Sequence, residues 1–98
     1  MLDQLGMWYA AQCDGEWENE YGISIATQED GRWRLRVDLV GTELGGDELS
    51  RELEARSETD WVEVWSDGYT FNALGGMSNL GELLTAFSRF ADSRVVPS

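Results

Sequence analysis

The sequence has no lysine and no histidine, and it contains one cysteine and one proline. Without histidine, a serine or cysteine nucleophile lacks its usual imidazole base. Without lysine, there is neither a Schiff-base amine nor the lysine of a P-loop. A single cysteine cannot form an internal disulfide. Residues 1–31 also contain no arginine, so Cys13 has no cationic neighbour there, and we interpret it as a packing residue at a helix end.

The charge is strongly one-sided: nineteen Asp and Glu residues stand against seven Arg residues, and the net charge is −12. Nucleic acid and anionic membranes attract cations, so this balance argues against both as direct ligands. It fits a basic partner protein, and solubility alone also explains it. No apolar run is long enough to span a bilayer and no signal-peptide pattern is present, so we expect a cytoplasmic protein.

The length and the periodicity predict an α+β fold in one small domain, 1–98, with 93–98 as a flexible tail. Helical spacing marks residues 1–12 and the stretch after Asn79, with Glu82 as the capping-box partner of Asn79. Period-two stretches lie between them. We expect an antiparallel sheet of about four to five strands, with both helices packed on one sheet face.

The first hairpin has a register that the sequence can test. Apolar residues alternate from Trp17 to Ala26 and again over residues 33–39, which predicts two strands. A three-residue turn at residues 29–31 places the apolar side chains of both strands on one face, whereas a two-residue turn separates them. The expected partners are Thr27 with Trp33, Ile25 with Leu35, Ile23 with Val37, and Tyr21 with Leu39.

The second half of the sheet is less regular. Residues 49–56 consist of helix formers but lie between strands, and we favour a strand over a helix. Residues 61–65 are strongly β-prone. A two-residue turn at Asp67-Gly68 then predicts that Val64 lies opposite Phe71 and Val62 opposite Ala73.

Acidic residues concentrate where the first helix meets the first strand. The candidates are Asp14, Glu16, Glu18 and Glu20, with Asp60 and Glu63 as lesser candidates. On a strand, the glutamates alternate away from the apolar side and are exposed, where a carboxylate keeps an ordinary pKa. We therefore expect a partner-binding surface, no catalytic residue, no metal and no cofactor. A small metal-binding or hydrolytic domain that uses the same carboxylates is the alternative.

Two further features have alternative interpretations. The Gly75-Gly76 pair precedes a helix and fits either a structural turn or an anion-binding helix start. Arg32, Arg34 and Arg36 line one face of the second strand, where they either cover the sheet and pair with acids or form a solvated face.

The order of several landmarks resembles the immunity protein 53 family of bacterial polymorphic toxin systems. The distinctive part is Trp8-Tyr9 followed by the segment Cys13–Gly22. Later landmarks agree along nearly the whole chain: Trp33, Val37-Asp38-Leu39, Thr42-Glu43-Leu44, Ser57-Glu58, Asp60-Trp61, Phe71, Gly75-Gly76 and Asn79-Leu80. The chain departs from the family at Asn19, where many members carry His, and near Trp65, where a Cys is frequent.

The resemblance implies an intracellular antidote that binds the C-terminal domain of a cognate toxin and blocks it without chemistry of its own. Many polymorphic toxins are nucleases, which tend to present basic substrate-binding surfaces. An acidic antidote can occlude such a surface by imitating phosphate charge. These expectations agree with the acidic composition and with the absence of a nucleophilic constellation.

Overall fold

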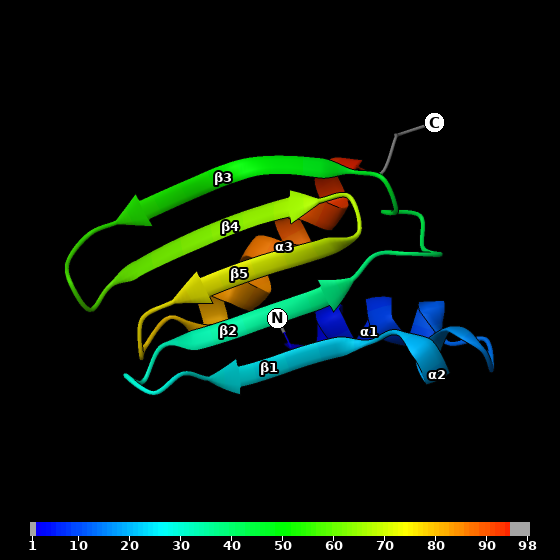
Figure 1. Cartoon of the computed structure of the whole chain (residues 1–98), viewed down its shortest axis with the longest axis horizontal. Coiled ribbons are helices and arrows are strands. Elements are labelled where there is room, and N and C mark those ends of the chain that lie inside the picture. The colour runs from blue at the N-terminus through cyan, green and yellow to red at the C-terminus, as the bar shows by residue number, and fades with distance from the viewer. Residues whose placement is uncertain (1, 95–98) are drawn as a thin grey trace.

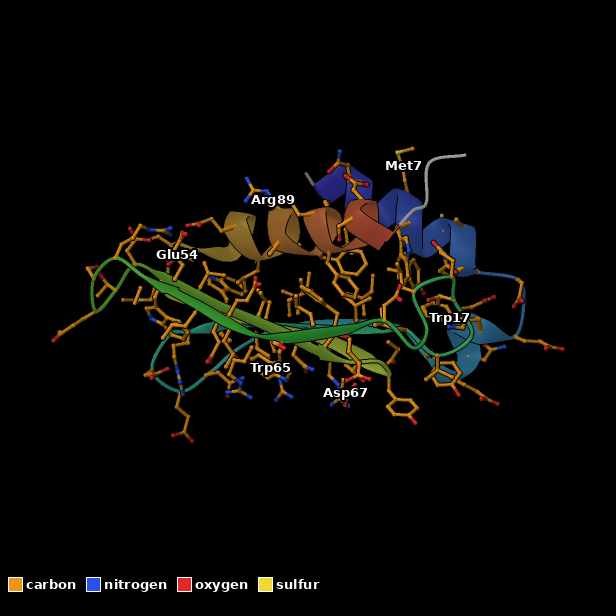
Figure 2. All side chains as sticks on the ribbon, turned by 90° about the horizontal axis from the view of Figure 1, so that it is seen from above. Met7, Trp17, Glu54, Trp65, Asp67 and Arg89 are labelled. Carbon is orange, nitrogen blue, oxygen red and sulfur yellow. The ribbon has the colours of Figure 1, made fainter. Side chains whose placement is uncertain are left out.

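The computed structural model describes residues 2–94 and shows an α+β fold built on one antiparallel sheet (Figure 1). The strand order is β1-β2-β5-β4-β3, and α1 and α3 lie on the same side of the sheet (Figure 2). The elements are α1 (Leu2–Gln12), α2 (Trp17–Glu20), β1 (Ile23–Thr27), β2 (Trp33–Asp38), β3 (Glu48–Ala55), β4 (Trp61–Asp67), β5 (Thr70–Gly75) and α3 (Leu80–Arg94). The expected fold class, strand count and helix placement are confirmed.

The first hairpin has the predicted three-residue turn. Ile23 pairs with Val37, Ile25 with Leu35 and Thr27 with Trp33. Gly31 has a φ of 85°, the left-handed conformation that the last position of this turn favours. The register therefore follows from the need to keep Leu35 and Val37, which are fully buried, on one side of the sheet.

The strand expected from Trp17 is wrong over its first residues, because residues 17–20 form the short helix α2 and β1 begins only at Ile23. The predicted pairing of Tyr21 with Leu39 is consequently absent, and the Leu39 N–H donates to the Tyr69 carbonyl instead. Trp17 and Tyr21 are four residues apart, a spacing that fits both a strand face and a helix face. Their rings lie 6.2 Å apart across the end of α2.

Residues 49–56 form a strand as favoured, and β3 covers Glu48–Ala55. The β4–β5 register is shifted by two residues from the expected one: Val64 pairs with Ala73 and Val62 with Gly75. The turn residues are Gly68 and Tyr69 rather than Asp67 and Gly68. The Asp67 carboxylate accepts the Tyr69 and Thr70 N–H groups, both at 2.9 Å, which holds Asp67 at the end of β4.

The core lies between the sheet and α3. Phe71 and Phe87 are almost completely buried, and their ring centroids are 5.3 Å apart in an edge-to-face contact. Burial of an aromatic side chain of this size contributes about 1.5–3 kcal/mol. Trp8 of α1 stacks edge-on against Phe87 at 5.0 Å, so α1 is fixed to the core largely through α3.

The flexible tail expected over 93–98 stays a prediction. Residues 93 and 94 belong to α3, while 95–98 lie outside the described residues. In the part of the chain that the structure describes, no helix combines the length and apolar character needed to cross a membrane.

Candidate partner-binding surfaces

The four acids at positions 14, 16, 18 and 20 surround α2 and form what we call the acidic corner. Asp14 Oδ1 accepts the N–H groups of Glu16 at 2.9 Å and of Trp17 at 3.0 Å, so Asp14 holds the turn that leads into α2, whose N-cap residue is Glu16. These two hydrogen bonds, the Trp17 bond being the stronger cause, lower the pKa of Asp14. Asp14 therefore remains ionised well below neutral pH.

Glu18 supports the same corner from the opposite direction. Its carboxylate accepts the Asp14 N–H at 3.0 Å and the Gly15 N–H at 2.8 Å. Gly15 has a φ of 95°, which lets the chain reverse between α1 and α2. Asp14 and Glu18 thus hold the backbone of the corner, in addition to supplying charge.

Glu16 and Glu20 are different, because their exposed carboxylates form no hydrogen bond or ion pair with any of the residues 4–93. Glu16 directly precedes α2 and Glu20 is its last residue. The predicted arrangement on one side of a strand is wrong, but these two acids still point to solvent together. They are the carboxylates of the corner most available to a partner.

Asp60 lies at the opposite end of the molecule, in the loop between β3 and β4 (Figure 1). Its carboxylate accepts hydrogen bonds from Arg56 at 2.8 Å and from Asn79 at 2.9 Å. These bonds, that from Arg56 first, lower the pKa of Asp60 to about 2. Arg56 also contacts Glu54 and Glu82, and Asn79 donates to Glu82 at 2.7 Å. Asp60 is thus part of a network that joins the β3–β4 loop to the start of α3.

The expected capping box of Asn79 and Glu82 takes a different form. The two residues are in contact, but the Asn79 side-chain amide donates to the Glu82 carboxylate, while Asn79 Oδ1 accepts the Trp61 N–H at 3.4 Å. Gly76 lies directly beside this group. An added Cβ on Gly76 would stand 2.3 Å from the Thr59 carbonyl oxygen. The close approach of two backbone segments therefore accounts for a glycine at this position and favours the structural interpretation of Gly75-Gly76.

Glu63 occupies a third location, on the sheet face that the helices leave uncovered. Its carboxylate lies 3.5 Å from the Arg51 guanidinium, and that guanidinium also stacks over the Trp65 ring at 4.1 Å. The structure therefore brings Asp14, Glu16, Glu18 and Glu20 together but places Asp60 and Glu63 on two other surfaces. The six predicted residues do not form one site.

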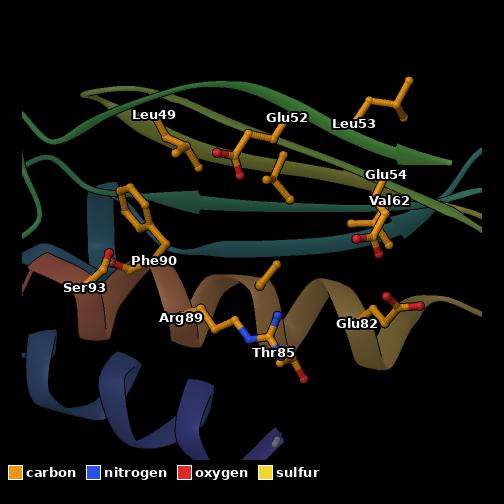
Figure 3. Close-up of a pocket in the computed structure, with 12 residues that line it drawn as sticks. Leu49, Glu52, Leu53, Glu54, Val62, Glu82, Thr85, Arg89, Phe90 and Ser93 are labelled. Atoms are coloured by element: carbon orange, nitrogen blue, oxygen red, sulfur yellow. The ribbon is translucent and has the colours of Figure 1, made fainter.

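A groove between β3 and α3 was not predicted from the sequence. It has a volume of about 590 Å³, and Figure 3 shows Glu52 and Glu54 reaching from the sheet toward α3. Leu49 and Glu52 both line it although they are three residues apart, because a bulge shifts the register of β3 between them. Because of this bulge, the residues that face the groove do not alternate regularly along β3, and the sequence pattern does not predict them. Nothing among the described residues indicates what would occupy this groove.

Cys13 is exposed, and its thiol donates to the Tyr9 carbonyl at 3.3 Å, one helical turn back. The predicted packing role is wrong, because the Cys13 side chain is exposed and makes this hydrogen bond at the surface. Over residues 2–94, no group of three or more Cys, Asp or Glu side chains has an arrangement that would hold a metal ion.

Comparison with known proteins gives one match. The model of the immunity protein 53 family matches residues 2–92. The chain belongs to this family. Membership implies an immunity function and a cognate toxin as partner. No curated protein and no solved structure matches the chain.

Aromatic side chains build the joint between α1 and β1. Trp17 is 7 % exposed, and its indole N–H donates to the Val40 carbonyl at 2.7 Å. Trp8 and Tyr9 pack edge-on against it, at 6.1 and 5.9 Å. The Asn19 side-chain amide donates to the Gly15 carbonyl at 2.9 Å. These aromatic residues therefore build the joint that presents the acidic corner.

Proposed function

We propose that this member of the immunity protein 53 family binds the C-terminal domain of its cognate polymorphic toxin in the cytoplasm and neutralises it. Binding occludes the active or substrate-binding surface of the toxin with an acidic face, and the chain carries out no reaction itself. The observation that carries the proposal is the acidic corner: four carboxylates within residues 14–20 surround one short helix, and the first arginine of the chain is Arg32.

The electrostatics of this corner favour a basic partner. Glu16 and Glu20 have no internal partner among the described residues, and hydrogen bonds from the backbone N–H groups of Trp17 and Glu16 lower the pKa of Asp14. A carboxylate cluster of this kind attracts cationic surfaces and speeds the encounter with them. A nuclease domain, whose substrate-binding surface carries cations for phosphate, is the toxin class that fits best.

The function is tested by mixing the chain with the C-terminal domain of its cognate toxin. We expect the two to co-purify and the toxin activity to fall in proportion to the added chain, reaching its minimum at a fixed molar ratio. Toxin that stays fully active with an excess of folded chain would refute the proposal. Calorimetric titration of the chain with calcium, magnesium and manganese tests the alternative, since tight binding with a large rise in Tm would instead indicate a metal-binding domain.

A further inference from the structure

The sheet has an open face that no described element covers, on the side opposite α1 and α3 (Figure 2). Solvent faces of antiparallel sheets are ordinarily polar. This one carries Trp65, which Figure 2 shows pointing away from the helices, and by strand alternation Trp61 and Leu74 as well. Leu53, opposite Glu63 in the register, is 61 % exposed. The open face is therefore partly apolar and aromatic.

Arginines lie on this same face, although the chain is acidic overall. Arg34 pairs across the sheet with Leu74, and Arg36 with Asn72, which in turn pairs with Trp65. Arg51 comes from β3 on the far side of Trp65 and stacks on its ring. The register thus places cations on both sides of Trp65 and Leu74, with Glu63, the partner of Arg51, between Leu74 and Leu53.

The charge of these arginines is only partly compensated. Arg51 is paired with Glu63, and Arg32 with Asp30. Arg34 is exposed and forms no ion pair or hydrogen bond through its side chain with any residue from 4 to 93, and its cross-strand neighbours, Leu74 and Ala26, carry no charge. A positive charge beside apolar side chains is complementary to a carboxylate that is itself flanked by apolar groups.

We propose that this open face is a second contact surface for the toxin domain, which meets it with a carboxylate over Arg34 and apolar side chains over Leu53 and Leu74. Tryptophan and arginine are the residue types that most often dominate binding energy at protein interfaces. The stacking of Arg51 on Trp65 also orders both side chains before the partner arrives, which reduces the entropy lost on binding. The inference rests on the proposed function, and it adds a contact whose charge is opposite to that of the acidic corner.

Two matched pairs of exposed substitutions test this contact. Arg34→Glu changes the charge of the open face, while Arg89→Glu makes the same change on the helix side of the molecule (Figure 2). Leu53→Gln and Met7→Gln remove an exposed apolar side chain from each side in the same way. All four residues are exposed, so we expect little change in Tm.

In binding measurements with the toxin domain, we expect Arg34→Glu to weaken affinity roughly thirtyfold, as for an interface hot spot, and Arg89→Glu to leave it nearly unchanged. Leu53→Gln should weaken it more than Met7→Gln does. Equal effects within each pair, with wild-type binding intact, overturn this inference and leave the proposed function standing. A wild-type chain that does not bind overturns both. A dimer of the free chain that only Arg34→Glu dissociates, with toxin binding unchanged, assigns the face to a second copy instead.

Discussion

Asn79 is one of the few buried polar side chains, and it shows how a single residue links three segments of the chain. Its amide donates to Asp60 and Glu82, and its carbonyl oxygen accepts from the Trp61 backbone. Arg56 completes the group by pairing with the same two acids. Because these acids are satisfied within the network, Asp60 stabilises the fold and is not a free contact for a partner.

The pairing of Asp60 predicts a pH dependence of stability. The pKa of Asp60 falls from an ordinary value of 3.8 to about 2 in the folded protein. The stability that this charge contributes is therefore present above about pH 4 and is lost as the pH falls toward 2. We expect Asp60→Asn to be less stable than wild type in urea unfolding at pH 6, and the difference to shrink between pH 4 and pH 2.

Glu58→Gln is the matched control for Asp60→Asn, since Glu58 lies in the same loop and its carboxylate has no partner within the described range. It should leave the free energy of unfolding nearly unchanged at pH 6. A constant difference between Asp60→Asn and wild type from pH 6 to pH 2 would show that the network does not depend on the charge of Asp60.

At the scale of elements, the sequence predicts regular segments well and their ends poorly. The register of the β1–β2 hairpin follows from alternation, because a wrong turn length would expose Leu35 and Val37. Alternation cannot predict α2, because this short helix depends on hydrogen bonds that the Asp14 and Glu18 carboxylates accept from the backbone. It cannot fix the β4–β5 register either, because a shift of two residues keeps every side chain on its face.

The surroundings of two glycines near the start of α3 predict opposite effects of replacing each glycine with alanine. Gly76 has no room for a Cβ, which would collide with the Thr59 carbonyl oxygen at 2.3 Å, and backbone on both sides must move to accept it. Gly81, within α3, has nothing within 4 Å of an added Cβ. We expect Gly76→Ala to destabilise the protein by about 1–3 kcal/mol and Gly81→Ala to stabilise it by about 0.5–1 kcal/mol.

Urea unfolding of the two glycine variants, monitored by tryptophan fluorescence, measures both effects. The two substitutions change the same atoms, so the difference between them reports only their surroundings. If Gly76→Ala has wild-type stability, the Thr59 carbonyl oxygen must lie farther from Gly76 than the 2.3 Å contact of an added Cβ implies. That result would also reopen the anion-binding interpretation of Gly75-Gly76.

At the scale of the whole molecule, charged side chains gather in three places, two of which hold acids and arginines together. The acidic corner lies at the end of the sheet where β1 begins, whereas the Asp60 network lies at the far end (Figure 1). Arg34 and Arg36 lie on the open face between them. The net charge of −12 predicts an acidic surface. It does not predict where on the surface the charged side chains gather, because the fold decides which face each residue occupies.

The central claim is that the acidic corner steers the chain onto a basic toxin surface. The double variant Glu16→Lys with Glu20→Lys reverses the charge at the two positions whose carboxylates are free. It keeps the hydrogen bonds that Asp14 and Glu18 accept from the backbone. The control is Glu29→Lys with Glu58→Lys, which changes the net charge equally in exposed loops at the other end of the sheet (Figure 1).

The decisive measurement is the association rate with the toxin domain as a function of ionic strength. For wild type, we expect fast association that slows steeply as salt is added. The corner variant should associate at least about tenfold more slowly at low salt and with a shallower salt dependence, because charge steering acts mainly on the association rate. The control should stay close to wild type. A corner variant that associates as fast as the control at every salt concentration would contradict the claim.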